Sequence, residues 1–111
     1  VYANSTARPY PDTPHEARQL LGNHLLNPVN FADEIRRMYK DGIRTFVEVG
    51  PKAVLTGLVQ NTLTDSTHSA FSIDGSAGRR SGMLDLANAL CRLAASGYPV
   101  RLDEWPVAQS V

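Results

Sequence analysis

The stretch that decides the fold is RTFVEVGP, residues 44–51. Its apolar residues Phe46, Val47 and Val49 form a nearly continuous run, which is typical of a parallel strand covered on both faces. The Gly-Pro pair ends this strand, and apolar residues then recur at helical spacing over residues 53–63. The order helix, strand, turn, helix predicts an α/β fold in which helices pack on a parallel strand.

Two helices are predicted before this strand. The first covers residues 14–25: Thr13 is placed to cap it, Glu16 completes a capping box, and its apolar stripe includes Leu20, Leu21 and His24. Residues 27–28, Asn-Pro, break this helix. The second helix follows Asn30 as its cap and ends at Gly42.

The chain after residue 63 is mostly polar up to Gly82, apart from a short predicted strand at residues 70–73. Ser81 is placed to cap a last helix over residues 83–96. Its inner side is expected to carry Leu86, Ala87, Leu90, Cys91 and Ala94. Residues 98–111 are expected to form an extended tail in which the lone Trp105 packs against another surface.

The composition excludes several classes of function. The chain has 111 residues, room for one domain, and its eleven basic and eleven acidic residues cancel. Lys and Arg are scattered, whereas nucleic-acid binding needs them clustered, so we expect neither a nucleic-acid nor a membrane partner. No apolar run approaches the roughly 20 residues that span a bilayer, and no signal peptide opens the chain, so we expect a cytoplasmic protein. We interpret Cys91 as a small buried hydrophobe rather than a nucleophile.

No complete catalytic set is visible in the residues themselves. The three histidines are too far apart for a local metal motif, so no metal site is predicted. The Gly-x-Ser-x-Gly nucleophile elbow is absent, and Ser76 lies in a Gly-Ser-Ala-Gly run without the strand and helix that an elbow needs. Gly50-Pro51-Lys52 before a helix favours phosphate binding only weakly, because Pro51 removes one N–H donor.

Three linked motifs resemble a known family. They are NPVNF at 27–31, FVEVGP at 46–51 and VLTGL at 54–58, with VYAN at 1–4 similar to the strand that opens this region. Their order is similar to the end of malonyl-CoA:acyl carrier protein transacylases and of the acyltransferase domains in type I polyketide synthases. The resemblance implies that residues 1–63 are the C-terminal part of an acyltransferase domain, within its hydrolase-like large subdomain. Residues 82–105 are similar to the segment that follows this domain in megasynthases, so residues 64–111 are expected to be a post-acyltransferase linker.

The resemblance implies a ping-pong transfer. A serine takes a malonyl-type extender unit from coenzyme A and passes it to the phosphopantetheine thiol of an acyl carrier protein, with a histidine as general base. The resemblance places both groups, and an arginine for the extender's carboxylate, before Val1. The chain alone is therefore predicted to be inactive and to bind no cofactor. Its expected partners are the rest of the acyltransferase domain, the ketosynthase and linker region, and the acyl carrier protein.

One active-site role carries over to this sequence. In the family, the residue three before the Asn-Pro-Val run offers its backbone carbonyl to the catalytic histidine, and that position is His24. The family often has Gln there, a difference that a backbone role tolerates. The other signature positions, Asn27, Pro28, Val29, Phe31, Glu48, Gly50 and Pro51, are expected to be structural.

Two other functions remain open at this point. In the first alternative, the chain is a scaffold or docking module that contacts neighbouring synthase domains. The polar linker and Trp105 are consistent with this alternative. A small phosphate-binding module would rest on residues 50–52 alone.

Overall fold

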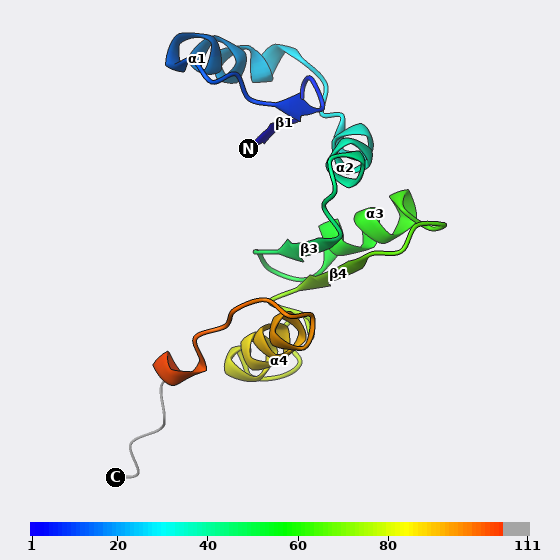
Figure 1. Cartoon of the computed structure of the whole chain (residues 1–111), viewed down its shortest axis with the longest axis vertical. Helices are drawn as coiled ribbons and strands as arrows, with labels where there is room; N and C mark the ends of the chain where they lie inside the picture. The colour runs from blue at the N-terminus through cyan, green and yellow to red at the C-terminus, as the bar shows by residue number, and fades with distance from the viewer. Residues whose placement is uncertain (106–111) are drawn as a thin grey trace.

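The structure, a computed structural model, describes residues 1–105. Its elements lie in the order shown in Figure 1. They are β1 (Tyr2–Ala3), β2 (Arg8–Pro9), α1 (Pro14–Gly22), the 3-10 helix η1 (Asn23–Leu26), α2 (Phe31–Lys40), β3 (Thr45–Glu48), α3 (Val54–Thr62), β4 (Ser69–Ser72), α4 (Gly82–Ala95) and the 3-10 helix η2 (Leu102–Glu104).

The centre of the fold is a parallel pair of strands. β3 and β4 pair in register, with Phe46 opposite Ala70, and α3 is the helix that connects them. A small core joins α2, α3 and β4 through Ile35, Val59, Leu63 and Ala70. The predicted α/β class, the strand–turn–helix at residues 45–62 and the short strand after residue 63 are thus confirmed.

The expectation that β3 is covered on both faces is wrong for this structure. Val47 is 36% exposed and Val49, just after the strand, is 80% exposed. The face that Val47 shares with Phe71 is covered at Phe71, which is 3% exposed, but is left open at Val47. The outer side of α3 is similarly open at Val54, Leu55 and Leu58. A parallel sheet normally has apolar layers on both faces. The exposed apolar side chains of β3 and α3 are therefore of the kind that a further layer would bury.

The N-terminal part differs from the prediction in how α1 is buried. α1 has no buried residue and gives way at Asn23 to η1, so the predicted stripe leaves Leu21 and Leu25 exposed. Thr13, Asn30 and Ser81 occupy the predicted cap positions, but none of their side chains bonds to the helix backbone. The Thr13 hydroxyl instead donates to the carboxylate of Glu16.

α4 faces the sheet with a different side from the one predicted. Its buried residues are Asp85 and Ala89, whereas Cys91 is exposed, which corrects the interpretation of Cys91 as a buried hydrophobe. The reason is that the carboxylate of Asp85 is hydrogen-bonded to Ser76 in the loop after β4, which orients the helix. The predicted extended tail contains η2 and a half-buried Trp105, and its last part, residues 106–111, lies outside the described residues.

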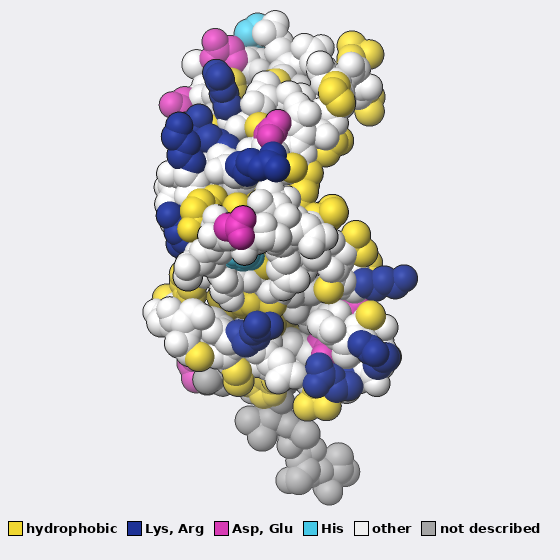
Figure 2. All heavy atoms as spheres, turned by 90° about the vertical axis from the view of Figure 1, so that its right-hand side faces the viewer, with side chains coloured by type: hydrophobic (Ala, Val, Ile, Leu, Met, Phe, Trp, Pro, Cys, Tyr) yellow, Lys and Arg dark blue, Asp and Glu magenta, His cyan; other side chains and the backbone are white. Residues whose placement is uncertain are grey.

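The chain is elongated, with extents of 53 × 35 × 27 Å. Its radius of gyration is 17.0 Å, against about 13 Å for a compact domain of this length. α1 and α4 lie at opposite ends of the molecule in Figure 1, and Figure 2 shows hydrophobic side chains on the surface between scattered Lys and Arg. Within residues 1–105, no helix combines the length and apolar character needed to cross a membrane.

Candidate functional site

His24 lies in η1, beside the start of the chain. Its ring nitrogen Nε2 is 3.2 Å from the hydroxyl oxygen of Tyr10, and the two rings are tilted by 56° at a centroid distance of 6.0 Å. Its backbone carbonyl accepts a hydrogen bond from the N–H of Asn27 over 3.3 Å. A carbonyl oxygen has two lone pairs, so this long bond leaves the oxygen able to accept another donor. The role of His24 toward a catalytic histidine stays a prediction.

The run from Asn27 to Asn30 connects η1 to the N-terminal hairpin. The Asn27 side chain donates to the carbonyl of Asn23 at 2.8 Å, which closes the last turn of η1. Asn30 donates through its backbone N–H to the carbonyl of Asn4 at 3.0 Å and through its side chain to the carbonyl of Ser5 at 3.2 Å. A cavity of about 180 Å³ lies beside these bonds, and His24, Asn27 and Ser5 are among the residues that line it. Asn27, a signature residue, therefore holds the end of η1, and Asn30 ties the following residues to the N-terminal hairpin.

A buried carboxylate lies one turn into α2. Glu34 is 7% exposed, and its Oε2 atom has no hydrogen-bond partner among the described residues. Burial raises the pKa of Glu34, and the nearby His24 ring lowers it by a smaller amount. The hydroxyl of Ser5 is also buried without a partner within residues 1–105. The neighbourhood of His24 thus contains unpaired polar atoms that the sequence did not reveal.

The turn between β3 and α3 is built around Glu48. Its carboxylate accepts the N–H of Leu55 at 3.1 Å, the N–H of Thr56 at 2.8 Å and the Thr56 hydroxyl at 2.8 Å. Burial raises the pKa of Glu48, but these donors outweigh that effect and hold the pKa below its ordinary value. Free N–H groups at a helix N-terminus are what a phosphate would bind, and here Glu48 already occupies them. Phosphate binding at residues 50–52 is therefore not supported.

The same turn is fastened to the end of β4. The Lys52 N–H donates to the carboxylate of Asp74 at 2.6 Å, and the Ser72 hydroxyl donates to the Lys52 carbonyl at 2.5 Å. Lys52 has a φ of 66°, a left-handed conformation that costs a non-glycine residue free energy. Asp74 also accepts the N–H of Gly78 at 3.3 Å, so it connects the two loops at the carboxyl ends of both strands.

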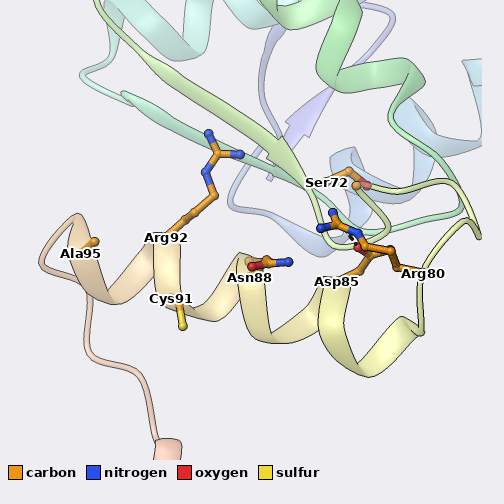
Figure 3. Close-up of a pocket in the computed structure, with 9 residues that line it drawn as sticks. Ser72, Arg80, Asp85, Asn88, Cys91, Arg92 and Ala95 are labelled. Carbon is orange, nitrogen blue, oxygen red and sulfur yellow. Dashed lines mark ion pairs between the residues drawn. The ribbon is translucent and has the colours of Figure 1, made fainter.

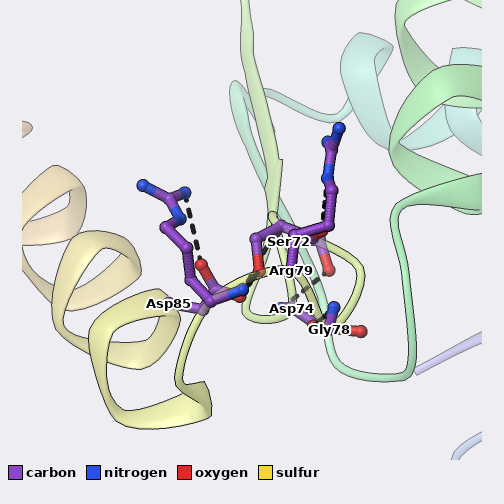
Figure 4. Close-up of polar contacts among 7 residues, drawn as sticks. Ser72, Asp74, Gly78, Arg79 and Asp85 are labelled. Carbon is purple, nitrogen blue, oxygen red and sulfur yellow. Dashed lines mark hydrogen bonds and ion pairs between the residues drawn. The ribbon is translucent and has the colours of Figure 1, made fainter.

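A second polar cluster joins the loop after β4 to α4 (Figure 4). The Asp85 carboxylate accepts the N–H of Ser76 at 3.2 Å and its hydroxyl at 2.5 Å, and its other oxygen is 3.3 Å from the Arg80 guanidinium. The Ser76 hydroxyl holds the pKa of Asp85 below its ordinary value. The sequence analysis considered Ser76 because its Gly-Ser-Ala-Gly run resembles part of a nucleophile elbow. In the structure Ser76 is a hydrogen-bond partner of Asp85.

The structure places the site residues predicted from the sequence in two separate regions. His24, Asn27 and Pro28 line one cavity, whereas Glu48, Gly50 and Pro51 form the separate turn before α3. Among the described residues, no three His, Cys, Asp or Glu side chains lie close enough to hold a metal ion.

Comparison with known proteins gives a consistent group of relatives. The chain is 33% identical over 107 residues to a polyunsaturated fatty acid synthase of Thraustochytrium sp., covering 95% of this chain and 4% of that protein. It is 34% identical over 90 residues to polyketide synthase GfsA of Streptomyces halstedii, covering 78% of this chain and 1% of the synthase. It is 35% identical over 60 residues to malonyl CoA-acyl carrier protein transacylase of Bacillus subtilis, covering 54% of this chain and 15% of the transacylase.

The chain thus spans only a small part of each of these relatives. No family model matches it. No solved structure matches it. The relatives nevertheless confirm the resemblance that the motifs indicated: this chain is a homologue of polyketide and fatty acid synthases and of malonyl CoA-acyl carrier protein transacylase, as expected for part of an acyltransferase domain of a type I polyketide synthase.

Proposed function

We propose that this chain is part of an acyltransferase that moves a malonyl-type extender unit from coenzyme A to an acyl carrier protein in polyketide biosynthesis. The observation that carries the proposal is the pair of similarities: one to a transacylase over 60 residues and one to a fatty acid synthase over 107 residues. We expect this reaction in the cytoplasm. The acyl-CoA and the phosphopantetheine arm are substrates of the whole enzyme, and this chain supplies neither the nucleophilic serine nor the histidine base.

The contribution of this chain to the chemistry is to orient the base. A histidine that takes a proton from serine needs its other ring N–H held by an acceptor, which fixes the tautomer. The His24 carbonyl is suited to this because its one internal hydrogen bond is long, at 3.3 Å, and because residues 27–30 hold η1 in place. The side chain of His24 lies against Tyr10 and has no assigned role in the transfer.

We also propose that β3 and β4 are neighbouring strands in the hydrolase-like large subdomain. The exposed apolar side chains of Val47 and Val49 beside the sheet, and of Val54, Leu55 and Leu58 on α3, support this, because neighbouring layers of the same domain would bury them. The division into an acyltransferase part at residues 1–63 and a linker at residues 64–111 stays a prediction, and β4 hydrogen-bonds to β3 across it.

Radiolabelled malonyl-CoA tests the proposal directly. The chain alone should acquire no covalent label, and adding the remaining part of the acyltransferase domain should give a labelled serine. Stable labelling of the 111-residue chain by itself would show that it contains the nucleophile. In the complete enzyme, His24→Gln should leave kcat within about twofold, because the backbone carbonyl remains. A tenfold loss of kcat at unchanged KM would instead assign the role to the His24 side chain.

A scaffold or docking role remains the second candidate. The same open apolar surface favours it, since such a surface marks a contact with another polypeptide. The two candidates differ in what Trp105→Ala changes. For a docking module the affinity for neighbouring synthase domains should fall, whereas unchanged affinity together with normal malonyl transfer would favour the acyltransferase.

A further inference from the structure

A hollow separate from the region around His24 lies near the C-terminal end of the described residues. It lies between the loop that follows β4 and one side of α4, and its volume is about 470 Å³ (Figure 3). Side chains from Arg80, Asp85, Asn88 and Arg92 line it. A second hollow of about 320 Å³ shares Arg92, Ser72 and Gly75 with it and continues toward α3. Volumes of this size accommodate a small molecule.

Two guanidinium groups dominate the charge of the hollow. Arg92 forms no ion pair with a carboxylate in the described part of the chain, and its guanidinium carbon lies 4.7 Å from the centre of the Phe71 ring. This stacking places the guanidinium against a buried aromatic face and leaves its N–H donors available to a ligand. Arg80 uses one nitrogen on Asp85 and has further donors available.

The one acidic group in the lining of the hollow, Asp85, is paired with Arg80, and its buried Oδ1 atom forms no hydrogen bond within the described residues. The side chain of Asp85 is 1% exposed and is held by Ser76 and by Arg80. It therefore orients Arg80 without presenting a free carboxylate to the hollow. The remaining charge of the lining is positive, and the amide of Asn88 adds a neutral donor on the same side of α4 (Figure 3).

We propose that this hollow binds a phosphate group, either free or at the end of a small organic molecule. Donors from Arg80, Asn88 and Arg92 reach the hollow from different positions, so a ligand that engages all three needs acceptor oxygens in several directions. The terminal oxygens of a phosphate provide this, whereas the two oxygens of a carboxylate lie in one plane. The site is separate from the N-terminus of α3, where Glu48 occupies the N–H groups.

The test is calorimetric titration of the full-length protein with inorganic phosphate, phenyl phosphate and benzoate. Arg92→Gln and Arg80→Gln should each weaken binding of the phosphate ligands at least tenfold. The matched control is Arg36→Gln, an exposed arginine of α2 paired with Asp33, which should leave binding unchanged. Tighter binding of phenyl phosphate than of inorganic phosphate would identify an organic phosphate as the source, and equal binding would identify the free anion.

Two results would overturn the proposal. One is phosphate affinity that does not change in Arg92→Gln, and the other is benzoate binding as tightly as phenyl phosphate. Arg92→Lys serves as the second variant, because it keeps the charge but loses the planar fork, and it should weaken binding by less than Arg92→Gln does. Malonyl transfer, measured separately, tests the proposed acyltransferase function and not this phosphate site.

Discussion

Glu48→Gln should destabilise the protein through the N-terminus of α3. In the native structure the Glu48 carboxylate accepts three donors, two from Thr56 and one from Leu55. Gln keeps one acceptor oxygen, but its NH₂ group faces N–H donors that it cannot accept. Losing a helix N-terminal acceptor costs about 0.5–2 kcal/mol, and hydrogen bonds to charged groups are at the upper end of such values. We therefore expect the free energy of unfolding to fall by about 1–2 kcal/mol at pH 7.

The pH dependence of this loss follows from the lowered pKa of Glu48. Burial raises that pKa, but the donors from Thr56 and Leu55 lower it further, so the folded pKa lies below the unfolded one. The carboxylate therefore stabilises the fold above its ordinary titration range, and that contribution is lost as the pH falls through the folded pKa. The difference between wild type and Glu48→Gln should be complete at pH 7 and should disappear in acid, below about pH 4.

Urea unfolding at several pH values measures the difference, and amide exchange at Leu55 and Thr56 localises it to α3. Glu104→Gln is the matched control, because Glu104 is an exposed glutamate paired with Arg101. Its effect should stay within about 0.5 kcal/mol. A Glu48→Gln variant as stable as this control at pH 7, or a deficit that persists unchanged in acid, would refute the assignment of Glu48 as the cap of α3.

Three further changes test other features of the structure. Glu34→Gln should raise the free energy of unfolding at pH 7 by about 1 kcal/mol, because burial raises the pKa of Glu34 and an unpaired buried charge is removed. Since a raised carboxyl pKa makes the native state less stable as the pH rises, this gain should shrink toward pH 4. Urea unfolding at pH 7 and pH 4 measures the gain, and an equal gain at both pH values would contradict the prediction. Lys52→Gly should stabilise the fold by up to about 1 kcal/mol by relieving the left-handed φ, and a lower melting temperature would argue against strain there. Asp85→Ala should lower the melting temperature by leaving Ser76 without its acceptor, and an unchanged temperature would contradict the role of this pair in positioning α4.

The strand–turn–helix at residues 45–62 could be predicted because its signals are local. β-branched and aromatic residues favour the strand, Gly50-Pro51 stops it, and helical spacing returns at once. The role of Glu48 was missed, although its position offered a signal. An acidic residue at the end of a strand, seven residues before Leu55, is within reach of the helix N-terminus when a tight turn reverses the chain.

The burial of α1 and α4 could not be predicted from periodicity. A helical apolar stripe shows which side of a helix prefers to be covered, but it does not show which layer is present to cover it. α1 accordingly exposes Leu21, and α4 turns Asp85 toward the sheet because Ser76 offers it a hydrogen bond. The same reason explains why Cys91 is exposed, although it lies on the apolar side of its helix. Pairing between residues nine apart, in a loop and a helix, leaves no periodic signal in the sequence.

The open surface around β3 and α3 connects stability to the proposed function. Burying a large aliphatic side chain contributes about 1.5–3 kcal/mol, and five such side chains are exposed here at residues 47, 49, 54, 55 and 58. These side chains are already partly covered, with exposed fractions between 36% and 80%, so covering the rest would contribute about 4–8 kcal/mol. That amount reaches the lower part of the about 5–15 kcal/mol by which an ordinary domain is stable. An adjoining layer of the same enzyme is the covering that the proposed acyltransferase supplies. If it does, amide exchange in β3 and α3 should slow by orders of magnitude when the remaining part of the domain is added. Equal exchange rates with and without that part would show that the layer is built elsewhere.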